Sequence, residues 1–251
     1  MAKQRTVIID YIANGASPYQ AGYAVVASDV IRATTTAITA AALGHPCFPV
    51  RSVEGAHELA RELDRPLLAG EQGGLLPPGF HLNNSPAQIA ARTDYNRPVI
   101  LLSSSGTKLI YGSAGADLVH LACFRNAGSI CGHLAGRHDR IALLGAATRG
   151  EFREEDRICC AWIARDLVAC GYAPGNRATA ELIDTWGGAT AMDCLASNSV
   201  AYLQRSGQMD DLAFILEHVN DIEESFVFSG NQVVSSGLGV ETPVAGAIGA
   251  R

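Results

Sequence analysis

Residues 23–43 read YAVVASDVIRATTTAITAAAL, which predicts a buried strand, a polar turn and an Ala-rich helix in succession. Tyr23–Ala27 is a nearly continuous apolar run of the kind found in strands buried on both faces. Ala33–Leu43 is predicted to be helical, and Gly44 follows it as expected for the left-handed residue that ends many helices. A strand followed by a helix is the repeating unit of α/β proteins, so this stretch favours a mostly parallel sheet covered by helices.

The same alternation continues along the chain. Further strands are predicted at Val7–Ile9, Cys47–Val50, Leu67–Ala69, Val99–Leu102, Leu118–Leu121 and Ile141–Leu144. Further helices are predicted at Val53–Leu63, Asn126–Ala135, Glu154–Cys170, Ala178–Trp186 and Ala191–Arg205, so the C-terminal third is mainly helical. We expect one α/β domain over residues 1–251, with a subdivision near residue 150 as the alternative. Gly237–Arg251, rich in Gly and Ala, is predicted to be a loosely held tail.

The composition narrows the class of protein. Hydrophobic residues make up 48% of the chain and charged residues 18%, which is enough apolar material for a large core. No apolar run reaches the roughly 18 residues of a membrane helix, and Val7–Ile9 is too short for a secretion signal. We therefore expect a cytoplasmic protein without a membrane partner. Basic residues number 19 against 25 acidic ones, without a Lys/Arg run, so nucleic acid is not an expected partner.

The cysteines and histidines give little sign of a metal or disulfide site. The seven cysteines are odd in number and contain no C-x-x-C pair, so we expect them to be small buried core residues. The histidines show no ligand spacing. His81, in a loop near Asn84, is the one retained as a candidate for catalysis.

Polar residues follow the strand at Tyr23–Ala27, where ligands bind in parallel sheets. Thr34 and Thr35 bring hydroxyls to a helix N-terminus, whose free N–H groups suit an anion. Arg32 adds a fork-shaped positive charge for a phosphate, sulfonate or carboxylate. Asp29 is a candidate metal ligand or a partner of Arg32. The alternative is a helix-capping Thr with a structural Asp–Arg pair.

A second polar turn, Ser103–Lys108, follows the strand at Val99–Leu102. Small hydroxylated residues and Gly106 allow backbone amides to approach a phosphate closely. The spacing fits neither a Walker loop nor a dinucleotide fingerprint. Ordinary helix capping by the serines is the alternative.

Acidic residues stand at two further strand ends. Glu71 follows the strand at Leu67–Ala69 among glycines and is a candidate ligand of Mg²⁺, which prefers one or two carboxylates plus water and substrate oxygens. An exposed loop glutamate is the alternative. Glu154, Glu155 and Asp156 open a predicted helix, where the helix dipole alone favours acids. Glu155 or Asp156 could instead face the metal.

Taken together, these motifs resemble the 2-phosphosulfolactate phosphatase (ComB) family. The resemblance runs from about residue 20 to about residue 205. It is carried by Asp29–Thr36, Gly70-Glu71, Gly79-Phe80, Asn84-Ser85-Pro86, Ser105-Gly106-Thr107, Asn126-Ala127 and Glu155-Asp156.

The resemblance implies a Mg²⁺-dependent phosphatase with a three-layer α/β/α fold. Its substrate would be 2-phosphosulfolactate, converted to sulfolactate on the way to coenzyme M. Carried over by position, Asp29, Glu71 and Asp156 become the catalytic and metal-binding carboxylates. The residues implied to bind the small anionic phosphorylated substrate are Arg32, Thr34, Thr35, Asn84, Ser104, Ser105, Gly106 and Thr107.

The chain departs from the family pattern near the expected anion site. Asn83 stands where the family has Gly, and Ser104–Thr107 replaces Thr-Asn-Gly-Thr. The part after about residue 225 also fits poorly. The alternatives are therefore an enzyme for another phosphorylated or phosphonylated hydroxy acid, or a binding protein for an anionic metabolite that has lost catalysis. A homodimer is expected because closed symmetric assemblies are common.

Overall fold

The computed structural model describes residues 4–12 and 16–237. The strands are β1 (Thr6–Ile12), β2 (Ala24–Ser28), β3 (Cys47–Val50), β4 (Leu67–Gly70), β5 (Val99–Leu102), β6 (Leu118–Ala122), β7 (Arg140–Thr148), β8 (Glu151–Phe152), β9 (Ala173–Pro174), β10 (Phe226–Ser229) and β11 (Gln232–Ser235). The helices are α1 (Ala33–Ala42), α2 (Val53–Ala60), α3 (Pro86–Ala90), α4 (Gly106–Gly112), α5 (Ala127–Leu134), α6 (Glu154–Ala169), α7 (Arg177–Trp186), α8 (Asn198–Arg205) and α9 (Met209–Glu217), with a 3₁₀ helix at Ala191–Ala196.

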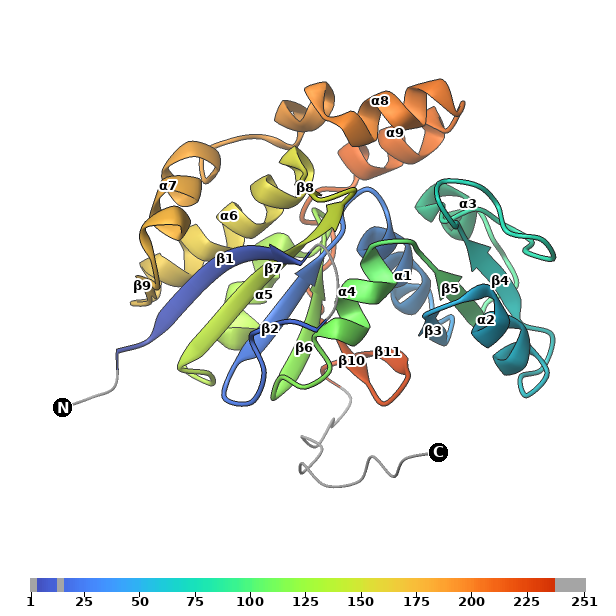
Figure 1. Cartoon of the computed structure of the whole chain (residues 1–251), viewed down its shortest axis with the longest axis horizontal. Helices are drawn as coiled ribbons and strands as arrows, with labels where there is room; N and C mark the ends of the chain where they lie inside the picture. Colours follow the sequence, from blue (N-terminus) through green and yellow to red (C-terminus); the bar gives the residue numbers. More distant parts are fainter. Residues whose placement is uncertain (1–3, 13–15, 238–251) are drawn as a thin grey trace.

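One mixed sheet runs through the molecule in the order β4-β5-β3-β11-β10-β6-β2-β7-β1-β9. It consists of two parallel groups, β4-β5-β3 and β6-β2-β7-β1-β9, joined by the antiparallel hairpin β10–β11. Figure 1 shows helices on both sides of this sheet. The prediction of a three-layer α/β fold is therefore confirmed.

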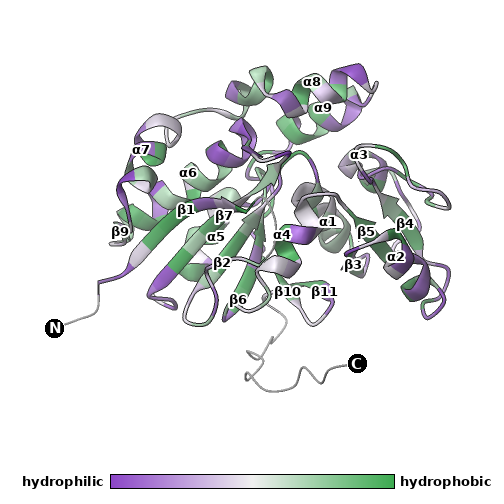
Figure 2. Ribbon diagram, viewed as in Figure 1, coloured by the Kyte–Doolittle hydropathy of each residue, from purple (hydrophilic) through white to green (hydrophobic). Residues whose placement is uncertain are grey.

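Burial explains why the central strands have so few polar residues. All five residues of β2 are buried, as expected for a strand covered on both faces. α4 and α6 both pack against β2 and β7, and Figure 1 shows α4 in front of the sheet. Figure 2 shows the same central strands in the green of hydrophobic residues. The apolar run from which the fold was predicted thus forms the middle of the core.

The strand register aligns the strand ends within each parallel group. Ser28, the last residue of β2, pairs with Gly145 of β7 and with Ala122 of β6. In the other parallel group, Gly70 at the end of β4 pairs with Leu102 at the end of β5. The residues that follow β2 are thereby held beside the end of β6 and the last part of β7, and those that follow β4 beside those that follow β5.

The C-terminal part differs from its prediction: Ala191–Arg205 is divided, and neither α9 nor the hairpin β10–β11 was predicted. Ala191–Arg205, predicted as one helix, is a 3₁₀ helix and α8, because Ser197 has an extended backbone and its Oγ caps the N–H of Val200. The hairpin β10–β11 was not predicted, although Gly230-Asn231 between two β-branched runs is a hairpin signal. Of the predicted tail, only Gly237 lies within the described residues. Across residues 4–12 and 16–237, no helix has both the length and the apolarity to span a membrane.

Candidate active site

Three acidic residues lie around the turns that follow β2 and β5. Asp29 follows β2 and is 4% exposed, Glu71 follows β4 and is half-buried, and Asp156 in the first turn of α6 is 2% exposed. Buried carboxylates are rare unless they are paired or bind a ligand. Their surroundings therefore decide what they can do.

Asp29 and Asp156 are joined through the backbone of the turn after β2. Asp156 Oδ1 accepts a hydrogen bond of 2.8 Å from the N–H of Val30. Asp29 Oδ1 accepts a longer bond of 3.3 Å from the N–H of Ala33, at the start of α1. The turn and the N-terminus of α6 thus hold these two carboxylates side by side.

Glu71 is connected to Asp29 through the turn before α4. Its Oε1 accepts a hydrogen bond of 2.6 Å from the N–H of Ser104, and its Oε2 accepts one of 3.0 Å from the Ser104 hydroxyl. Two residues later, Gly106 lies so close to Asp29 that a Cβ atom on it would be 2.4 Å from Asp29 Oδ2. The turn at Ser104–Gly106 therefore lies between Glu71 and Asp29, and the three predicted acids belong to one site.

The pKa values of the carboxyl groups reflect this crowding. Burial raises the pKa of Asp29 to about 7, and the charges of Glu71 and Glu155 add to the rise, although the Ala33 N–H and Arg32 oppose it. Burial, followed by the charges of Asp29 and Glu155, raises the pKa of Asp156 well above its usual value. Burial likewise raises the pKa of Glu155. Such a group of acids is stabilised by a proton or by a cation.

The donor set suits a hard cation. Within the described ranges, no three His, Cys, Asp or Glu side chains are grouped so that they could hold a metal by themselves. Mg²⁺ does not need such a cage, because it keeps several waters and binds one or two carboxylates plus substrate oxygens. Glu155 Oε2 is buried and has no hydrogen-bond partner among the described residues, so one more carboxylate oxygen is free. The oxygen ligands therefore fit Mg²⁺.

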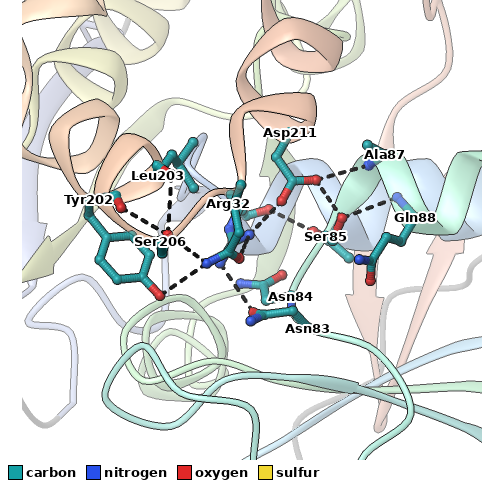
Figure 3. Close-up of polar contacts among 12 residues, drawn as sticks. Arg32, Asn83, Asn84, Ser85, Ala87, Gln88, Tyr202, Leu203, Ser206 and Asp211 are labelled. Carbon is teal, nitrogen blue, oxygen red and sulfur yellow. Dashed lines mark hydrogen bonds and ion pairs between the residues drawn. The ribbon is translucent and has the colours of Figure 1, made fainter.

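Arg32, predicted to bind an anion, lies in a buried network shown in Figure 3. It is 4% exposed, and its Nη1 lies 2.5 Å from Asp211 Oδ2 on α9. Its Nη1 also donates to Gln208 Oε1 at 2.5 Å and its Nη2 to Asn83 Oδ1 at 3.2 Å. Arg32 is thus paired with Asp211 and not with Asp29, the partner that the alternative interpretation gave it.

Asn84 lies beside this network and offers a free acceptor (Figure 3). The residue is 2% exposed, and its Oδ1 has no hydrogen-bond partner in the part of the chain that the structure describes. Its neighbour Ser85 donates to Asp211 Oδ1 at 2.5 Å. The Asn-Ser-Pro motif therefore supplies one residue to the ion-pair network and one unsatisfied polar group.

The predicted threonines hold the turns by bonds to backbone carbonyls. Thr34 Oγ1 donates to Ala122 at 2.7 Å, Thr35 Oγ1 to Val30 at 2.7 Å and Thr107 Oγ1 to Ser103 at 2.8 Å. All three are buried, so in this structure they fix the shape of the turns. Ser105 is the N-cap residue of α4. Direct contacts of these residues with a substrate stay predictions.

His81 and Asp211 have surroundings that differ from those expected from the sequence. His81 Nδ1 accepts a hydrogen bond of 3.0 Å from the N–H of Leu68, which connects the loop to β4. Asp211 and Gln208 were not predicted to belong to the site. Asp211 stands in the first turn of a helix, where the helix dipole alone explains an acid, and no local pattern connects it with Arg32.

Comparisons with known proteins point to one family. Residues 11–222 match the profile of a family described as 2-phosphosulpholactate phosphatase. A probable 2-phosphosulfolactate phosphatase from Symbiobacterium thermophilum is 34% identical over 221 residues, which cover 85% of this chain and 94% of the relative. One from Deinococcus radiodurans is 34% identical over 191 residues, covering 74% and 80%. One from Pseudothermotoga lettingae is 32% identical over 151 residues, covering 60% and 65%.

Proposed function

Because the chain belongs to the 2-phosphosulpholactate phosphatase family, we propose that it hydrolyses 2-phosphosulfolactate to sulfolactate and phosphate, with Mg²⁺ as its cofactor. The reaction is a step toward coenzyme M. The family match covers every residue of the candidate site, since all of them fall between residues 11 and 222.

The observation that carries the proposal is the linkage of three acids through the turns after β2 and β5. Ser104 bonds to Glu71, Gly106 contacts Asp29, and Asp156 accepts from the residue after Asp29. A site that only bound an anion would be weakened by three carboxylates, because like charges repel. A phosphatase can use them to hold a cation and to move a proton.

One or two of Asp29, Glu71 and Asp156 would hold Mg²⁺, together with waters and substrate oxygens. The ion, when bound, supplies positive charge to the phosphoryl oxygens. Burial raises the pKa of Asp29 to about 7 without a cation, and a bound cation would lower it. Whichever of the three carboxylates does not bind the ion is suited to accept a proton from an attacking water. Direct attack by Asp29 on phosphorus is the alternative.

The remaining residues would orient the substrate. Arg32 brings a positive charge to the site, although Asp211 neutralises part of it. The unpaired atom of Asn84 is its Oδ1, an acceptor, so it would receive a hydrogen bond from the substrate or a water. The N–H groups of Ala33 and Thr34 at the start of α1 already bond to Asp29. Arg32 therefore supplies the positive charge that would meet an anionic group of the substrate.

We also propose that the protein acts in the cytoplasm as a homodimer. The homodimer is proposed because closed symmetric assemblies are common. Light scattering on the purified protein would measure the mass directly, and a value near 26.4 kDa would contradict the dimer.

The test is phosphate release from a panel of phosphorylated C3 acids, including 2-phosphosulfolactate and phospholactate, with Mg²⁺ or with EDTA. We expect release from 2-phosphosulfolactate that EDTA abolishes and that added Mg²⁺ restores. Release from another panel member alone would favour the related enzyme with a different substrate. Failure of the folded protein to release phosphate from any of them would favour the non-catalytic binding protein.

A further inference from the structure

Two cysteines are in contact at the C-terminal end of α6, away from the carboxylates at its N-terminus. Cys131 on α5 and Cys170 at the C-cap of α6 place their sulfur atoms 3.3 Å apart, with both thiols free. A disulfide bond is about 2.05 Å long, so a further approach of roughly 1.3 Å would bring the sulfurs to bonding distance. Cys170 stands at a helix end, where the last turn adjusts more easily than the interior.

The two thiols differ in access to solvent. Cys170 is exposed, whereas Cys131 is 7% exposed. Burial, followed by the neighbouring Cys170 thiol, raises the pKa of Cys131 to about 12. Because the thiolate is the nucleophile in thiol–disulfide exchange, Cys170 is the residue that an oxidant in solution would meet first.

The other five cysteines lack this combination of contact and access. Cys47, Cys123, Cys159, Cys160 and Cys194 are all buried. Their thiols pack in the core, as the sequence predicted for all seven cysteines, and the exposed Cys170 contradicts that prediction. The exposed Cys170 with its neighbour is therefore the cysteine site at which a reagent in solution can act.

We propose that Cys131 and Cys170 form a redox-active pair, which a small-molecule disulfide such as oxidised glutathione converts to an intramolecular disulfide. The Cys170 thiolate attacks one sulfur of the reagent, which forms a mixed disulfide and releases the first reagent thiol. The Cys131 sulfur then attacks the Cys170 sulfur and releases the second thiol. Two protein thiols are oxidised, one reagent disulfide is reduced, and the two thiol protons pass to the two released thiolates.

The disulfide would join α5 to α6 at the end of α6 that lies away from the carboxylates. Asp156 is in the first turn of α6, and Cys170 follows its last turn, about 21 Å along the helix axis. The bond would close a loop of about 40 residues, which restricts the unfolded chain. We therefore infer a stabilising link between two packed helices, independent of the chemistry proposed for the acids.

The test incubates the folded full-length protein with oxidised glutathione, removes the reagent, and measures intact mass and the number of free thiols after denaturation. We expect a loss of two of the seven thiols, no bound glutathione, and a tryptic fragment in which Cys131 and Cys170 are joined. The oxidised protein should also melt several degrees higher than the reduced protein.

Two variants make the outcome decisive. Cys170→Ser changes an exposed position, so it should fold, and it should keep its remaining thiols under the same treatment. Cys131→Ser should instead retain one glutathione on Cys170, because the second thiol is missing. Loss of two thiols in Cys170→Ser, or a stable glutathione adduct on the wild-type protein, would overturn the proposal.

Discussion

Asp156 Oδ1 accepts a hydrogen bond of 2.8 Å from the backbone N–H of Val30, which lies 126 residues earlier in the chain. This bond fastens the N-terminus of α6 to the turn after β2. It also brings the Asp156 carboxylate close enough to Asp29 for the charge of Asp29 to raise the pKa of Asp156. The geometry of the acids therefore depends on how α6 packs on the sheet.

Replacing Asp29 with Asn tests the role of its charge. The substitution keeps the shape of the side chain and removes a buried charge that the neighbouring acids repel. We expect phosphate release to fall at least about 100-fold, the scale of a lost proton-transfer group, while the free energy of unfolding at pH 7 does not decrease. Enzyme assays and urea unfolding measure the two quantities.

Asp139→Asn is the control for this substitution, since the Asp139 side chain is 54% exposed and its nearest ion pair, with Arg5, spans 3.9 Å. It should leave both quantities unchanged. Activity of Asp29→Asn close to that of the wild type would remove Asp29 from the catalytic residues.

Replacing Gly106 with Ala tests the contact between the turn and Asp29. The new Cβ would lie 2.4 Å from both Asp29 Oδ2 and Ala33 Cβ, so the turn or the carboxylate must move. We expect a loss of about 1–3 kcal/mol in stability from the overpacking and a clear loss of activity. Gly132→Ala in α5 is the matched control, because its Cβ meets nothing within 4 Å. That control should be neutral or slightly stabilising; a harmless Gly106→Ala would contradict the close approach.

Some residues of this site could be predicted from the sequence, because each directly follows a strand that is itself recognisable from its apolar residues. Asp29 and Glu71 follow apolar runs, and the carboxyl ends of strands are where ligands bind. The long-range parts had no local signal. Asp211 looks like an ordinary helix-start acid, and only the packing of α9 against α3 brings it to Arg32. The hairpin β10–β11 is a similar case, because its place between β3 and β6 depends on strands more than 100 residues away.

Removing the charge of Asp211 tests the buried ion pair with Arg32. Both side chains are 3% exposed, so Asp211→Asn leaves the Arg32 charge buried without its partner. We expect a loss of about 3–5 kcal/mol in unfolding free energy, together with a raised KM if Arg32 binds the substrate. Urea unfolding and substrate titration measure the two effects.

The more exposed pair between Arg125 and Asp221 provides the comparison. Its side chains are 12% and 31% exposed, so Asp221→Asn should cost no more than about 1 kcal/mol. The double variant Arg32→Met with Asp211→Leu should regain most of the lost stability and none of the activity. Equal losses from Asp211→Asn and Asp221→Asn would show that the Arg32 pair is not effectively buried.

The buried His120 should make the free energy of unfolding depend on pH. Burial, followed by the positive charges of His138, His133 and Arg137, lowers its pKa from 6.5 to about 3. Between these two values the folded protein keeps His120 neutral while the unfolded chain binds a proton, so acid favours unfolding. Ser225 Oγ lies 2.7 Å from its Nδ1. His120→Asn has no proton to bind, so its stability should fall less steeply below pH 6.5, by up to about 1.4 kcal/mol per pH unit.

Urea unfolding at intervals from pH 8 to pH 4 measures this difference. The gap between the two proteins should be constant above pH 7.5, and parallel curves below pH 6.5 would show that His120 is not held neutral.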